Sequence, residues 1–140
     1  MIDTMRTLIF PAKFDHLDEI REFVGDFARE AGFSTKGIYS VQLAADEAAS
    51  NIIEHAYEGI ANGQLEISCT LKGNRLVITF HDDGMPFDPS KVRQPNLNAD
   101  LSERQIGGLG VYLMRQLMDE VHYQSKRGAG NLLTMIKRRG

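Results

Sequence analysis

The 140-residue sequence contains a single cysteine, Cys69, so it can form neither a disulfide within the chain nor a metal site built from several cysteines. It has no apolar run near the roughly 18 residues that a membrane-spanning helix needs. The N-terminal stretch carries acidic side chains early and lacks a long apolar core, so we expect no signal peptide. These features predict a cytoplasmic protein without a membrane segment.

An excess of basic charge is missing as well. Lys and Arg number 16 against 19 Asp and Glu, which gives a formal net charge of −3, and the pI is about 5.8. Nucleic-acid-binding domains usually carry a basic surface, so we expect no direct contact with nucleic acid. The apolar content of 42% is that of a globular protein, and the length suits one domain over residues 1–140.

Several common catalytic motifs do not occur. The sequence has no G-x-x-x-x-G-K-[ST] phosphate loop, no G-x-S-x-G nucleophile elbow and no H-E-x-x-H zinc pair. Its glycine cluster follows a long irregular stretch rather than a strand, unlike the dinucleotide-binding fingerprint of a Rossmann fold. P-loop hydrolases, α/β serine hydrolases and zinc proteases therefore do not fit.

Two helices are expected in the first half of the chain. Residues 6–12, RTLIFPA, form a short apolar run ended by a proline, which predicts an edge strand. Apolar residues then recur at helical spacing over 17–31, and Gly32 is expected to end this helix. Ser34 or Thr35 is expected to cap the next helix.

The second half predicts a sheet. Apolar and polar residues alternate over 65–71 and 76–80 around the turn KGN, which is typical of an antiparallel hairpin. Residues 82–108 break this alternation of apolar and polar residues. A helical stretch follows them. Residues 120–126 and 131–137 then predict a closing hairpin. We expect a two-layer α/β (α+β) sandwich, with a mixed, mainly antiparallel sheet and helices on one face.

The first group of candidate site residues lies on the second helix. Glu47, Asn51 and His55 stand four residues apart and share one stripe. An asparagine oxygen suits Mg²⁺, and a carboxylate one turn earlier could orient or deprotonate an attacking hydroxyl. The alternative is a polar helix margin packed under a loop. His55, one turn further, is given a structural or loop-contacting role.

A second group follows the expected hairpin, in HDDGMPFD. Asp82 comes at the end of a strand, where its carboxylate could accept a hydrogen bond from an exocyclic amine such as that of adenine. Gly84 would let a ligand approach the backbone. The alternative is an ordinary turn, although no strand follows at once.

The third group is a glycine cluster in GGLGVYLM, where Gly107, Gly108 and Gly110 precede an apolar helix. Free N–H groups at a helix N-terminus can bind phosphate. A hinge with close helix packing explains the glycines equally well.

The order of these groups, E-x-x-x-N, then D-x-G-x-P, then a long loop and G-G-x-G, resembles the GHKL ATPase superfamily. ADEAASNIIEHAY, DDGMPFDP and GGLGVYLMRQLMDEVHY are most similar to the small anti-sigma factor serine kinases of bacterial partner-switching systems. The resemblance spans nearly the whole chain. It implies an ATP-binding, histidine-kinase-like fold whose ATP lid is formed by residues 87–106.

The resemblance also implies roles for the candidate residues. Asn51 would coordinate Mg²⁺ between the phosphates, and Glu47 would act as base or orienter for the attacking hydroxyl. Asp82 would bind the adenine amine, with Gly84 under the nucleotide. The remaining candidates would contact phosphate groups: Gly107, Gly108, Gly110 and, from the lid, Arg104. In one respect the sequence departs from the family, because Asn131 stands where a threonine near the adenine is common, and Thr134 lies on the opposite strand face.

The implied activity is transfer of the γ-phosphate of Mg-ATP to a Ser or Thr of a STAS-type anti-sigma antagonist. The implied second partner is a sigma factor, sequestered in alternation, and exposed apolar residues on the first strand or helix would suit a homodimer. Two other hypotheses stay open: a regulatory binding module without catalysis, and a metabolic enzyme for small molecules whose glycines are only structural.

Overall fold

The computed structural model describes residues 5–86 and 108–140 of the chain. Within these ranges the elements follow one another as β1 (Met5–Pro11), η1 (Phe14–His16), α1 (Leu17–Glu30), α2 (Thr35–Asn51), η2 (Ile52–Ala56), β2 (Gln64–Lys72), β3 (Arg75–Asp82), α3 (Gly108–Leu117), β4 (Glu120–Lys126) and β5 (Gly130–Arg138). None of the helices in this described part is long and apolar enough to cross a bilayer.

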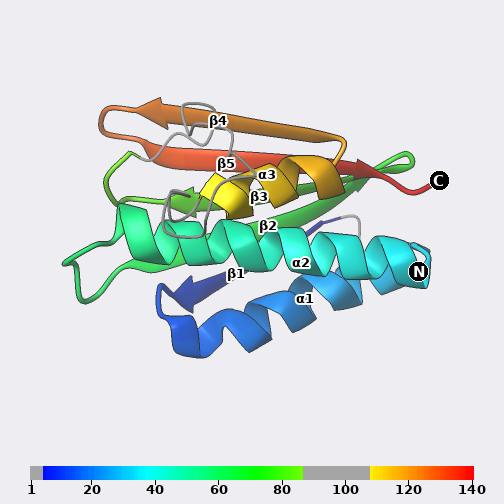
Figure 1. The fold of residues 1–140 in the computed structure, drawn as a ribbon, viewed down its shortest axis with the longest axis horizontal. Coiled ribbons are helices and arrows are strands. Elements are labelled where there is room, and N and C mark those ends of the chain that lie inside the picture. The colour runs from blue at the N-terminus through cyan, green and yellow to red at the C-terminus, as the bar shows by residue number, and fades with distance from the viewer. Residues whose placement is uncertain (1–4, 87–107) are drawn as a thin grey trace, which may run out of the picture.

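The strands form one sheet in the order β1-β2-β3-β5-β4, and all three α-helices lie on one of its faces (Figure 1). The predicted two-layer sandwich is therefore confirmed, with one correction. We expected a mixed sheet, but every pairing among the described strands is antiparallel. β4 does run in the same direction as β3, yet β5 lies between them and pairs with both.

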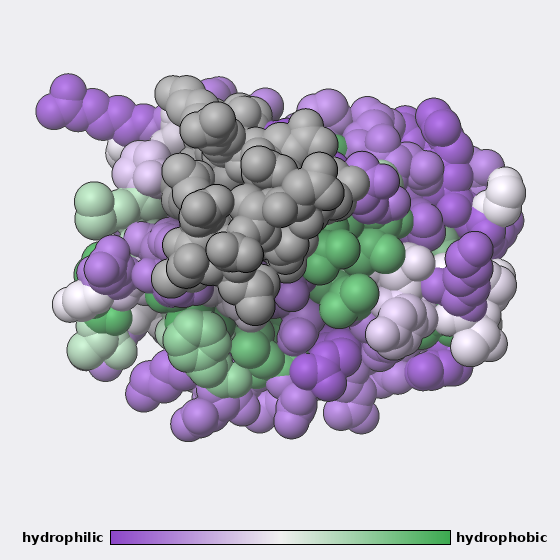
Figure 2. Space-filling model, viewed as in Figure 1, coloured by the Kyte–Doolittle hydropathy of each residue, from purple (hydrophilic) through white to green (hydrophobic). Residues whose placement is uncertain are grey.

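The core lies between the sheet and the helices because both carry apolar residues on their facing sides. Alternate residues of β2 and β3, among them Leu65, Ile67, Ile78 and Phe80, are fully buried, as period-two patterning requires. Helix α1 contributes residues at helical spacing, including the fully buried Phe27. The outer side of the helical layer is mostly hydrophilic (Figure 2).

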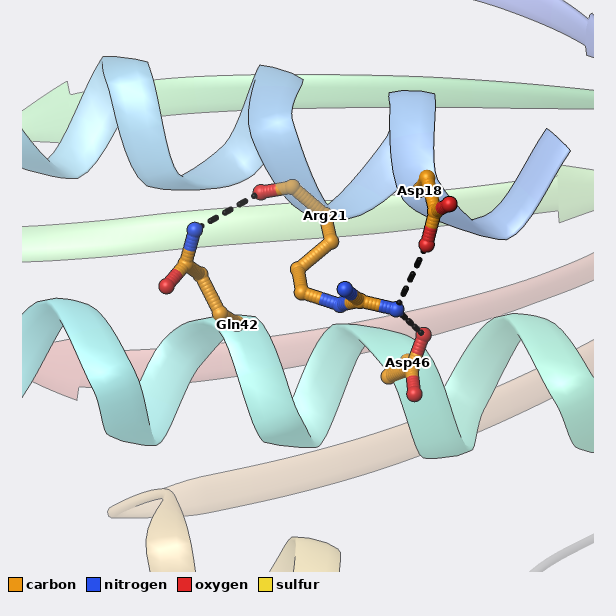
Figure 3. Close-up of polar contacts among 4 residues, drawn as sticks. All are labelled: Asp18, Arg21, Gln42 and Asp46. Carbon is orange, nitrogen blue, oxygen red and sulfur yellow. Dashed lines mark hydrogen bonds and ion pairs between the residues drawn. The ribbon is translucent and has the colours of Figure 1, made fainter.

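Helices α1 and α2 are joined by polar contacts between residues of which most are half-buried (Figure 3). The Arg21 guanidinium of α1 donates to Asp18 at 3.1 Å in its own helix and to Asp46 of α2 at 3.4 Å. Gln42 of α2 donates to the carbonyl of Arg21 at 3.3 Å. Both helices can approach closely at Gly25, where an added Cβ would meet the Gln42 side chain. These contacts fix α2, which carries two candidate site residues.

A serine caps the start of α2. Ser34 has extended backbone angles, and its hydroxyl accepts a hydrogen bond from the N–H of Gly37 at 3.1 Å. Thr35 is the first residue of the helix itself. Of the two predicted caps, the structure therefore selects Ser34.

We predict that Ser34→Ala lowers the free energy of unfolding by about 1 kcal/mol, because the Gly37 N–H loses its acceptor. Thr35→Ala is the matched control and should change stability far less, since its hydroxyl makes no such cap. Urea denaturation of both variants measures the difference. Equal losses from the two substitutions would contradict the assignment of the cap.

Candidate functional site

A pocket opens between α2, α3 and the sheet. The empty space among its lining residues totals about 330 Å³ when the open solvent at its mouth is included, but the centre of a water-sized sphere can occupy only about 20 Å³ of it. Its walls are mostly apolar, with the polar groups of Asn51 and Asp82 among them. The residues around it come from helices on one side and strands on the other: Ala48, Asn51, Ile52, Ala56, Asp82, Met114, Tyr123 and Leu133. An apolar pocket with a few convergent polar groups is the usual form of a small-molecule site.

Asp82, the last residue of β3, is only 3% exposed. Its Oδ1 accepts one hydrogen bond from the Asn131 side-chain amide at 2.8 Å and another from the Gly84 N–H at 2.9 Å. Burial raises the pKa of Asp82, while these two hydrogen bonds oppose that rise. Among the described residues, none donates to Oδ2. One oxygen of the carboxylate is therefore held by the protein, and the other is left for a donor in the pocket.

Asn51, the last residue of α2, is 6% exposed. Its Nδ2 is buried, and no described residue accepts a hydrogen bond from it. A buried amide without a partner is costly, so the group is suited to an additional ligand. Rotation of the amide would present its oxygen at the same place, and that oxygen is a ligand Mg²⁺ accepts. No cluster of three or more His, Cys, Asp or Glu side chains forms a metal site within the described residues.

Glu47 lies one helical turn before Asn51 and is half-buried. Burial raises the pKa of its carboxyl, and the neighbouring charge of Asp46 raises it further. Glu47 is not among the residues that line the pocket. It stands on the same helix at the margin of the site, where it could act on a group held beside the pocket.

The end of α2 is joined to the turn after β3. Residues 52–56 form a π-helix, a feature often found at functional sites, and the carbonyl of Ala56 accepts the N–H of Met85 at 2.7 Å. Gly84 is required there, since an added Cβ would lie 2.3 Å from the Ala56 oxygen. The close approach at Gly84 is thus to the protein's own backbone.

The glycine cluster differs from the sequence prediction. We expected all three glycines to precede the helix, but α3 begins at Gly108, so Gly108 and Gly110 belong to its first turn. Gly107, Arg104 and the predicted lid 87–106 lie outside the described residues. His55 lies in the π-helix and is partly buried.

Sequence reasoning missed three contributors to the site. Met114 of α3 forms part of the pocket wall and is 1% exposed. The hydroxyl of Tyr57 donates to the Gln64 carbonyl at 2.6 Å and accepts the Asp83 N–H at 3.0 Å, which ties the turn after β3 to the start of β2. Asn131 was noticed only as a departure from the family. The apolar spacing after the glycines could have indicated Met114, whereas nothing in the sequence pairs Tyr57 with Asp83.

The chain matches a known domain family over most of its length. The model of the histidine kinase-like ATPase domain matches residues 10–137, and the chain belongs to this family. Serine-protein kinases named RsbW are among its relatives. The one from Listeria monocytogenes is 30% identical over 132 residues, covering 91% of this chain and 84% of the relative. The one from Bacillus subtilis is 34% identical over 131 residues, covering 89% and 80%. The resemblance predicted from the motifs is confirmed.

Solved structures agree on the fold. The RsbU and RsbW domains of a Mycobacterium tuberculosis protein match with a TM-score of 0.66 at 17% identity, covering 95% of this chain and 32% of that longer one. The catalytic domain of the histidine kinase ThkA matches with a TM-score of 0.57 at 12% identity, covering 96% of each chain. Because the family is that of histidine kinase-like ATPase domains, adenine nucleotide is the ligand class to expect.

We predict that Gly84→Ala destabilises the protein by roughly 1–3 kcal/mol, because the new methyl group would displace the Ala56 carbonyl and break its hydrogen bond with Met85. Gly140→Ala is the control, as nothing lies within 4 Å of an added Cβ there. Thermal unfolding of both variants measures the effect. An unchanged melting temperature for Gly84→Ala would show that the turn does not need this close approach.

Proposed function

We propose that the protein is a serine/threonine-protein kinase that binds Mg-ATP and phosphorylates a Ser or Thr of a STAS-type anti-sigma antagonist. We further propose that it sequesters a sigma factor in alternation with this reaction, in the cytoplasm. The observation that carries the proposal is the shared pocket of Asn51 and Asp82, where a buried amide without a described partner and a half-satisfied carboxylate face one apolar space.

The two polar side chains of this pocket suit two different parts of a nucleotide. The free oxygen of Asp82 would accept a hydrogen bond from the adenine amine, and the apolar wall would cover the ring. The Asn51 oxygen would be one ligand of a magnesium ion, which neutralises charge on the phosphate oxygens when it is bound. Gly107, Gly108 and Gly110 would leave backbone N–H groups open to the phosphates.

Glu47 would serve the transfer step. Its carboxylate would accept the proton of the antagonist's hydroxyl as that oxygen forms a bond to the γ-phosphorus, and the bond from the γ-phosphorus to the bridging oxygen of ADP would break. A base must be ionised to act, and a carboxyl with a raised pKa binds the proton more strongly than an ordinary one. The lid 87–106 with Arg104 would close over the γ-phosphate as part of the same proposal.

Self-association is also part of the proposal. β1 is the edge strand of the sheet and exposes Met5 (58%), Leu8 (48%) and Ile9 (59%). Exposed apolar side chains on an unpaired strand edge favour association, which would suit a homodimer.

We predict that Asp82→Asn weakens ATP binding by about 10- to 100-fold, because an amide N–H would then face the adenine amine and two donors would meet. Asp83→Asn, one residue further and exposed, is the control and should bind as wild type does. Binding is measured by the rise in melting temperature with Mg-ATP, since a ligand at a hundredfold excess over Kd stabilises by about 2.7 kcal/mol. Equal shifts for Asp82→Asn and wild type would reject the adenine site, and no shift in wild type with any adenine nucleotide would favour a different small-molecule enzyme.

We predict that Glu47→Gln retains ATP binding but loses transfer by at least about 100-fold, the usual contribution of a positioned base. The assay incubates the protein with γ-labelled ATP, Mg²⁺ and STAS-type antagonists encoded by neighbouring genes, and follows label on the antagonist. Glu54→Gln, an exposed residue of the π-helix, is the control. ATP binding by the wild type without transfer to any antagonist would favour the non-catalytic regulatory module.

A further inference from the structure

One row of residues paired across the strands of the sheet is polar on one side of Asp82 and apolar on the other. The register aligns Ser125 of β4 with Asn131 of β5, and Asn131 with Asp82 of β3. On the other side of Asp82 the row continues into the apolar residues Leu65 and Phe10. The polar half of the row is joined by hydrogen bonds: the Ser125 hydroxyl donates to Asn131 Oδ1 at 2.7 Å, and Asn131 Nδ2 donates to Asp82 Oδ1 at 2.8 Å.

The chemistry of its neighbours fixes the orientation of the Asn131 amide. Nδ2 lies near the Asp82 carboxylate and 2.9 Å from the carbonyl of Gly84. An ionised carboxylate and a carbonyl can only accept hydrogen bonds, so the amide nitrogen must face them. The amide oxygen then faces Ser125, whose hydroxyl is free to donate. Both hydrogens of the amide are used, and the side chain is 2% exposed.

We propose that Asn131 is a positioning residue that sets the nucleotide specificity of the site. Its amide, oriented by Ser125, holds Asp82 Oδ1 and the Gly84 carbonyl together, so that Asp82 Oδ2 is presented to the pocket as a hydrogen-bond acceptor. This inference rests on the proposed binding of ATP and concerns how the site selects an adenine. Asn131 itself does not need to touch the nucleotide.

The arrangement favours a base with an amino group over one with a carbonyl at the same position. A carboxylate oxygen attracts an amine and repels a carbonyl oxygen. If Asn131 were removed, Oδ1 would lose a donor, so the carboxylate could rotate or bind a proton and then donate to a carbonyl instead. Removal of Asn131 should therefore lower the preference for the base with the amino group, in addition to any loss of affinity that both bases share.

A threonine at position 131 could make only one of the two hydrogen bonds that the Asn131 amide donates. Its hydroxyl has one hydrogen, so it could donate to Asp82 or to the Gly84 carbonyl but not to both at once. Asparagine supplies two donors from one group, and it supplies them from the strand directly opposite Asp82. The departure from the family at Asn131 thus adds a contact to the turn after β3.

The test measures Kd for ATP and for inosine triphosphate, in which a carbonyl replaces the adenine amine. The variants are Asn131→Ala, Asn131→Thr and Ser125→Ala. Thr134→Ala is the control, since Thr134 lies on the same strand with its side chain on the opposite face of the sheet. We expect Asn131→Ala to reduce the preference for ATP over inosine triphosphate by about tenfold, the effect of one hydrogen bond. Asn131→Thr should recover part of that preference, and Ser125→Ala should reduce it less than Asn131→Ala does.

Three results would overturn the inference. If Asn131→Ala weakened both nucleotides equally, or left both unchanged, Asn131 would have a structural role only, and ATP binding by the wild type would still stand. If Asn131→Ala did not fold, an unchanged preference in both Asn131→Thr and Ser125→Ala would reject the inference. If wild type bound no adenine nucleotide, the proposed function would fail and the inference with it.

Discussion

The hydrogen bonding of the Asp82 carboxylate is the constraint on which the rest of the site depends. A carboxylate buried to this degree is unfavourable unless donors surround it, and Oδ1 receives two, from Asn131 and from the Gly84 N–H. The first donor requires the observed register of β3 with β5. The second requires the chain to turn immediately after β3. A slip of one residue would move Asp82 to the other face of the sheet, so strand pairing and the polar end of the pocket are specified together.

The helical side of the site is connected to the same turn through the backbone. A helix ends with carbonyl groups that have no partner within it, and the Ala56 carbonyl at the end of the π-helix finds one in the N–H of Met85. Tyr57 adds a second link through Asp83. One main-chain hydrogen bond between η2 and the turn, together with the hydroxyl of Tyr57, therefore sets the relative position of Asn51 and Asp82.

The sequence predicted those parts of the fold that depend on local patterns. Period-two alternation identified β2 and β3, helical spacing identified α1 and α2, and Gly32, with φ of 88°, follows the end of α1 as expected. Asp82 was placed at a strand end because the alternation stops there. What escaped prediction depends on contacts between distant segments. The pairing of Asn131 with Asp82 follows from β5 inserting between β3 and β4, and no single-strand pattern encodes that insertion.

Glu47 is the residue at which the hypothesis of a kinase and that of a purely binding module differ. Glu47 is half-buried on α2 beside a second carboxylate, Asp46, and both burial and that neighbour raise its pKa. Asp46 is paired with Arg21, whereas among the described residues no cation forms an ion pair with Glu47. Placing a carboxylate where its charge is disfavoured costs stability, and the proposed binding of nucleotide through Asn51 and Asp82 does not require it. For proton transfer the same placement is useful, because a base that binds its proton more strongly accepts it more readily from an attacking hydroxyl.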